Sequence, residues 1–174
     1  MQNGLEQKGK EGRRRQAKEK WKGVGFWVAS LTWGCLMTFI GAIIALVMLI
    51  IGKKPRRFHY FIYFSIGEYW GGFNCGPFFF IDGDTAKAHE RRVRASENGT
   101  GSGWSLRMIQ HEAGHGLQNI MLGVFMPFVI AIPSCIRYWY RELRYYRKGR
   151  CPKTEYDDIW FEGWATNLGV EHYR

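Results

Sequence analysis

Hydrophobic and polar positions divide the chain into a charged start, one long uncharged run and a mixed remainder. Residues 1–22 hold eight Lys or Arg, three Glu and few large apolar side chains, which predicts a disordered or loosely helical basic arm of cytoplasmic type. Residues 24–51 contain no charge over 28 positions. Because about 20 apolar residues cross a bilayer as a helix, residues 23–52 are predicted to form a retained transmembrane anchor. A cleaved signal peptide is disfavoured, since the apolar run is too long for one and ends without a small-residue cleavage site.

The next segment, residues 58–81, is rich in Phe, Tyr and Ile and is interrupted by glycine pairs. Aromatic and β-branched runs separated by glycine turns predict an aromatic β-hairpin. A second spanning helix is the alternative, and Glu68, Pro77 and the glycines disfavour it.

Two later segments have helical patterns. Residues 104–122 are predicted to form one helix, and residues 155–170 a second with acidic residues in its first turn. Between them, residues 120–136 are 17 positions without a charge, interrupted by Pro127 and Pro133. Residues 82–103 have the small and polar composition of a loop.

Composition limits the size and the partners of the protein. With 174 residues, the chain suits one anchor and one compact domain, residues 53–174. The net charge is +10, and two basic clusters flank the uncharged run, which favours a lipid bilayer with anionic headgroups as partner. We expect no specific nucleic-acid binding, because no recognition module accompanies the basic residues. The four cysteines form no CxxC pair, which argues against cysteine-bound zinc.

The motif with the clearest chemistry is His111-Glu112-Ala113-Gly114-His115. Histidines at i and i+4 project from one face of a helix and can hold one Zn²⁺. Glu112 would then act as the catalytic base, taking a proton from a water on the metal and passing it to the leaving amine. The plain alternative is two ordinary polar residues on an amphipathic helix.

A catalytic zinc needs a third protein ligand. We predict Glu162, which lies in the second helix among Trp160, Phe161 and Trp164, where an unpartnered carboxylate is costly to bury. His172, near the end of the chain, ranks second. The alternative for Glu162 is exposure to solvent or an ion pair with an arginine.

These motifs resemble those of known membrane proteases. The segment from Glu162 to Gly169 and the segment HEAGHGLQ are similar to elements of the M48-like gluzincins, the membrane-associated group that includes HtpX and Ste24 proteases. Residues 66–170 are more similar to small, uncharacterised bacterial membrane proteins predicted to be metallopeptidases. The resemblance implies zinc bound by His111, His115 and Glu162. Thr166 stands where the M48-like pattern has Asp, a residue that would orient a ligand histidine, so zinc affinity or turnover is expected to be weaker.

The ligands also constrain the topology. The histidines precede residues 120–136 and Glu162 follows them, so a single crossing of the bilayer there would separate the ligands by about 30 Å. We therefore expect a proline-broken apolar hairpin that is re-entrant or buried. The side that the domain faces stays open: the charges around the anchor favour the outside, whereas the third basic cluster, residues 137–150, and the resemblance favour the cytoplasm.

Together these features predict an α+β protein: a transmembrane helix followed by a zincin-like domain. The expected function is a membrane-anchored zinc endopeptidase that acts on peptide or protein substrates. The alternatives are a non-catalytic membrane protein with a structural zinc site, an inactive relative of the metallopeptidases, and a metal-free scaffold. The oligomeric state and the residue that stabilises the oxyanion stay open; the candidates for the latter are Tyr138, Tyr140, Tyr145, Tyr146, Tyr156 and His172.

Overall fold

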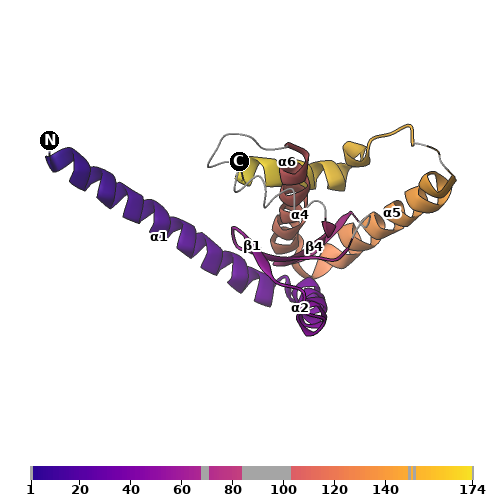
Figure 1. Ribbon diagram of the computed structural model, residues 1–174, viewed down its shortest axis with the longest axis horizontal. Helices are drawn as coiled ribbons and strands as arrows, with labels where there is room; N and C mark the ends of the chain where they lie inside the picture. The colour runs from indigo at the N-terminus through magenta and orange to yellow at the C-terminus, as the bar shows by residue number, and fades with distance from the viewer. Residues whose placement is uncertain (1, 68–70, 84–102, 149, 151, 174) are drawn as a thin grey trace.

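The structure is a computed structural model that describes residues 2–67, 71–83, 103–148, 150 and 152–173. It confirms a mixed α and β architecture, in which one small sheet lies between helices (Figure 1). The helices are α1 (Gln2–Thr32), α2 (Cys35–Ile50), α4 (Gly103–Leu122), α5 (Ile132–Arg144) and α6 (Trp160–His172). Short 3₁₀ or π segments are η1 (Gly123–Phe125), η2 (Pro127–Ala131), η3 (Tyr146–Lys148) and η4 (Tyr156–Asp158).

The aromatic segment forms four short strands: β1 (Arg56–Phe58), β2 (Phe61–Ser65), β3 (Gly72–Cys75) and β4 (Phe78–Ile81). Their order in the sheet is β1-β2-β4-β3. The outer pairs are antiparallel, whereas β2 and β4 run parallel in the centre. The predicted hairpin is therefore two tight hairpins joined side by side, and the segment is not a spanning helix.

Side chains from the central strands alternate between two apolar clusters, as the period of a strand requires. Phe61 and Tyr63 of β2 pack against α4, together with Phe79 of β4. On the other face, Phe64 and Phe80 pack with residues of α2 and η2. The sheet is thus covered by α4 on one face and by α2 on the other, with α6 lying across α4 (Figure 1).

The uncharged run near the start of the chain is not one continuous helix. It is divided at Trp33 and Gly34, where the chain turns by 98° between α1 and α2. Thr38 of α2 donates a hydrogen bond across the bend to the carbonyl oxygen of Ser30 (2.8 Å). The prediction of a single helix over residues 23–52 is corrected accordingly. The basic arm, expected to be disordered or loosely helical, belongs to α1.

Among the residues that the structure describes, no single helix combines the length and apolarity needed to cross a bilayer. Two sharply bent helix pairs reach that length and composition together: Gln16–Thr32 with Cys35–Ile50, and Leu106–Phe125 with Pro127–Arg144.

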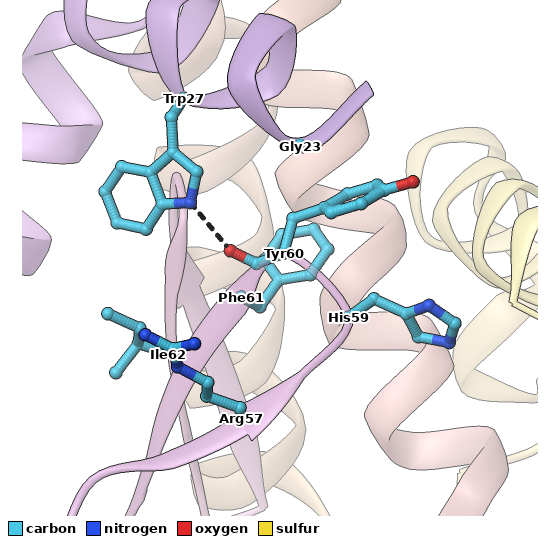
Figure 2. A pocket seen from close by; sticks show the side chains of 7 residues that line it. All are labelled: Gly23, Trp27, Arg57, His59, Tyr60, Phe61 and Ile62. Atoms are coloured by element: carbon cyan, nitrogen blue, oxygen red, sulfur yellow. Dashed lines mark hydrogen bonds between the residues drawn. The ribbon is translucent and has the colours of Figure 1, made fainter. Parts of the chain in front are cut away.

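The end of α1 is fastened to the turn between β1 and β2. Trp27 donates its indole hydrogen to the carbonyl oxygen of Tyr60 (2.9 Å), and Gly23 lies directly against the Tyr60 ring (Figure 2). His59, also in this turn, has the positive φ of 49°. These contacts hold the end of α1 beside the sheet, and the rest of the helix extends away from it (Figure 1).

The second apolar run also bends, but in a different way from the expected hairpin. Helix α4 ends at Leu122, and Gly123 adopts the left-handed φ of 58° that commonly ends helices. The chain turns by 116° near Met126 and then continues through η2 into α5. Pro127 thus marks the start of the second piece, whereas Pro133 lies in the first turn of α5 and does not interrupt it.

Candidate metal centre

Three predicted ligands converge between α4 and α6. Nε2 of His111 and Nε2 of His115 lie 3.2 Å and 3.1 Å from the same oxygen, Oε2 of Glu162. One ligand atom from each residue lies within 4.8 Å of the others, and all three side chains are buried. Glu162 has no exposed surface at all.

Small residues allow α6 to approach α4 this closely. A Cβ on Gly114 would overlap the carbonyl oxygen of Ala165, and one on Gly169 would overlap that of Gln110. The backbones of the two helices therefore touch on both sides of the site. This contact brings the face of α6 that carries Glu162 and Thr166, which are four residues apart, against the two histidines.

Gln118 fixes the proton position on His115. Its Nε2 donates to the carbonyl oxygen of Phe161 (2.8 Å), so its Oε1 is the atom that faces Nδ1 of His115 (2.8 Å). An amide oxygen only accepts hydrogen bonds. His115 therefore carries a hydrogen on Nδ1 and, when neutral, presents the lone pair of Nε2 to Glu162.

His111 is held by Thr166, the residue at the position where the sequence departs from the M48-like pattern. Oγ1 of Thr166 lies 2.7 Å from Nδ1 of His111. The same hydroxyl donates to Oδ2 of Asp157 (3.0 Å). Asp157 lies in η4 and also faces the guanidinium of Arg107 (3.6 Å) at the surface.

The second oxygen of Glu162 is bound from α5. Ser134 donates to Oε1 at 2.5 Å, which leaves Oε2 to face the histidines. Burial alone would raise the pKa of Glu162, but its contacts with His111, His115 and Ser134 hold the pKa well below its usual range. The direction of this shift favours the charged carboxylate, the form that binds a metal.

Glu112 lies beside the three ligands, against β3. Its backbone oxygen accepts a hydrogen bond from Asn74 (2.9 Å), and its carboxylate fills the space next to Gly72. Oε2 of Glu112 is buried without a hydrogen-bond partner among the described residues. Burial raises the pKa of Glu112, although His111 and His115 partly oppose this. A buried carboxylate with a free oxygen and a raised pKa suits a general base.

The three predicted ligands and Glu112 line one cleft of about 640 Å³. Strand β3, at the edge of the sheet, forms one wall, and α5 forms the other. Much of the remaining lining is apolar, including Met37, Met126 and Ile130. Tyr156 and Asp157 close the cleft beside His111.

The donor set fits a zinc ion. Two imidazole nitrogens and one carboxylate oxygen are a known set of protein ligands for catalytic zinc. Two ligands that each lie about 2.1 Å from a tetrahedral ion are roughly 3.4 Å apart, close to the 3.1 Å and 3.2 Å between the Nε2 atoms and Oε2. A cation would also relieve the contact between the Nε2 lone pairs and the carboxylate. Without one, that contact favours a proton on His115, whose pKa rises because Glu162 and Glu112 outweigh the effect of burial.

The other residues considered from the sequence differ in where they lie. His172 is exposed and faces the carbonyl oxygen of Leu168 on its own helix (3.2 Å). Tyr138 and Tyr156 line the cleft, whereas Tyr140 and Tyr145 do not. The side chain of Tyr146 lies outside the described part of the chain.

Sequence reasoning did not assign roles to Gln118, Ser134 and Asp157. Gln118 follows His115 by three residues on the same helix, and that spacing could have identified it. Ser134 and Asp157 are distant from the motif in sequence, and only the bend after α4 and the turn before α6 bring them to it.

No protein-family model matches the chain, and neither a curated protein nor a solved structure does. The resemblance to the M48-like gluzincins therefore stays a prediction from the sequence motifs.

Proposed function

We propose that the protein is a membrane-associated zinc peptidase. The observation that carries this proposal is the convergence of His111, His115 and Glu162, with the free carboxylate oxygen of Glu112 buried in the same cleft. Bound zinc would polarise the substrate carbonyl and lower the pKa of water to near 7. The residues of the chain supply the remaining chemistry.

Glu112 is the proposed base. It takes a proton from the attacking water and gives it to the amine that leaves when the peptide bond breaks. Burial raises the pKa of Glu112 towards neutral pH. Both the uptake of the proton from water and its release to the amine are therefore easier than for an exposed carboxylate. Its place against β3 directs it towards a substrate lying along that strand.

The peptide substrate is proposed to bind along β3. This strand pairs with β4 on one side and forms an edge of the sheet on the other. Extended peptides commonly add to such an edge through backbone hydrogen bonds. Because Gly72 lies against the carboxylate of Glu112, a peptide on this edge would pass beside the base. The apolar wall formed by Met37, Met126 and Ile130 favours apolar side chains in the substrate.

A lipid bilayer is the proposed partner of the two bent helix pairs. Helix α2 buries one face on the sheet and exposes an apolar face that includes Phe39, Ile43 and Leu46. A second apolar stripe runs along η1, η2 and α5. It includes Phe125, Phe128, Ile132 and Ile136, all of them exposed. Exposed apolar surface on this scale is characteristic of membrane or protein contact, and the flanking basic residues favour anionic lipids.

The test is peptide cleavage by the full chain reconstituted in lipid vesicles, read by mass spectrometry on a mixture of synthetic peptides. Glu112→Gln should lower cleavage by about 10²–10⁴-fold, because it removes the general base, and should leave the zinc content unchanged. Glu171→Gln, at an exposed position of α6, is the control and should cleave as the wild type does.

Cleavage by Glu112→Gln at the wild-type rate would refute the assignment of the base. If the wild type holds zinc but cleaves none of the peptides, and Glu112→Gln behaves identically, the result would favour the alternative function, a structural zinc site.

A further inference from the structure

We propose that Asp157 acts through Thr166 as a positioning residue for the metal ligand His111, so that two residues together perform the task of a single orienting carboxylate. This inference rests on the proposed zinc site. It concerns how the chain selects the form of His111 that can bind a metal.

The directions of the two hydrogen bonds follow from the chemistry of the groups. A carboxylate only accepts, so the Thr166 hydroxyl donates its one hydrogen to Asp157 (3.0 Å). The hydroxyl oxygen is then left to accept from Nδ1 of His111 (2.7 Å). His111 therefore carries its hydrogen on Nδ1 and presents the lone pair of Nε2 to the site.

Without Asp157, the hydroxyl would be free to turn. It could donate to Nδ1 of His111, which would favour the tautomer with a hydrogen on Nε2, and that tautomer cannot bind a metal through Nε2. The carboxylate thus selects the competent tautomer without touching the histidine. Partners of this kind typically account for 10–100-fold in metal affinity.

Local structure holds Asp157 in place. Glu155 and Asp158 form a reciprocal capping box around η4, in which Asp158 accepts from the backbone nitrogen of Glu155 (2.8 Å). Gly163, in the first turn of α6, lets the backbone of Asp157 approach closely, since a Cβ there would lie 2.7 Å from its carbonyl oxygen. These contacts place Asp157 beside Thr166, which is itself buried.

The two hydrogen bonds that join Asp157, Thr166 and His111, here called the relay, also account for the departure from the M48-like pattern. The sequence has Thr where that pattern has Asp, which suggested a weaker site without a charge near the histidine. Asp157, nine residues earlier in the chain, supplies the charge through the threonine hydroxyl. We therefore expect a zinc affinity similar to that of a site with a direct carboxylate.

The test measures zinc affinity of the detergent-purified full chain by competition with a chromophoric chelator. Thr166→Val keeps the shape of the side chain but removes the hydroxyl, and Asp157→Asn removes the charge. Both should weaken zinc binding by about 10–100-fold. Thr166→Ser restores the hydroxyl and should bind as the wild type does.

Three further measurements separate the relay from a merely structural role. Glu171→Gln removes an exposed carboxylate of α6 that lies outside the relay, and Arg107→Gln removes the surface ion pair with Asp157 but leaves the relay intact; neither should change zinc affinity. Thermal unfolding in excess chelator should give similar midpoints for Asp157→Asn and Glu171→Gln, because the relay acts on the metal.

A wild type that takes up no zinc would overturn both the metal site and the relay. Zinc affinity of Thr166→Val equal to that of Thr166→Ser would overturn the relay alone. If Thr166→Val does not fold, Asp157→Asn decides: a zinc affinity equal to that of the wild type and of Glu171→Gln refutes the proposal.

Discussion

At the scale of single residues, we propose Tyr156 as the residue that would stabilise an oxyanion in the proposed reaction. Its ring centre lies 6.4 Å from that of His111, and its hydroxyl lies 3.5 Å from Oγ of Ser134. The guanidinium carbon atoms of Arg137 and Arg141 lie over the Tyr156 ring, 5.6 Å and 5.5 Å from its centre. Burial raises the pKa of Tyr156, and the charge of Glu162 raises it further. The phenol therefore stays protonated at neutral pH and can donate a hydrogen bond.

Tyr156→Phe tests this role. Loss of one oxyanion donor typically lowers turnover by about 10²–10³-fold, and we expect such a loss in peptide cleavage while the zinc content stays at the wild-type value. Tyr138→Phe is the matched control, since Tyr138 lines the same cleft and lies on α5. Equal turnover for Tyr156→Phe and the wild type would remove Tyr156 from the mechanism.

At the scale of elements, the crossing of α4 and α6 builds the site. The ligand histidines lie on α4 and Glu162 on α6, so their distances depend on how closely the two backbones approach. Gly114 and Gly169 permit that approach. Because the interior of a protein is closely packed, an added methyl group here must push the helices apart.

Gly169→Ala should therefore destabilise the protein by about 1–3 kcal/mol or more, and it should weaken zinc binding because Glu162 moves away from the histidines. The free energy of unfolding and the zinc affinity measure the two effects. Gly25→Ala is the control: Gly25 is exposed in α1 with nothing within 4 Å of the added Cβ, and alanine there should stabilise the helix by about 0.5–1 kcal/mol. A fully stable Gly169→Ala variant with wild-type zinc affinity would contradict the packing argument.

The elements also show which features the sequence could predict. The helix of the His111–His115 motif was predictable from its local pattern. The helix that carries Glu162 was predicted over residues 155–170, but α6 begins at Trp160, and Asp157 and Asp158 lie in η4 before it and not in its first turn. The parallel pairing of β2 with β4 was not predictable, since it depends on contacts between segments that alternation alone does not relate. The break at Trp33 and Gly34 was not predictable, because the run around it is uncharged throughout. Hydropathy measures how apolar a segment is and does not show where a helix bends.

The ligand set was predicted from spacing and from the cost of burying Glu162, whereas the residues that support it were not. Gln118 lies on the motif helix itself. Ser134 and Asp157 reach the site through long-range packing, and Arg137 shows why: with its guanidinium it binds the carbonyl oxygens of Glu155 and Tyr156 (3.0 Å and 3.1 Å). This contact ties α5 to the segment before α6.

At the scale of the whole molecule, the proposed metal site depends on the bend of 116° after α4. The histidines and Glu162 lie on opposite sides of the apolar run in sequence, and a straight passage through a bilayer would separate them. After the bend, α5 leads away from α4, and the chain comes back beyond the end of α5 so that α6 lies across α4 (Figure 1). The apolar faces of α2 and α5 lie outside this arrangement, where they can contact lipid.

The most direct measurement is the zinc content per chain of the purified wild type, beside Glu162→Gln and the control Glu171→Gln. The proposed centre predicts one zinc ion per chain in the wild type and in Glu171→Gln, and its loss in Glu162→Gln. A wild type without zinc, or a Glu162→Gln variant that holds zinc as tightly as the wild type, would contradict it.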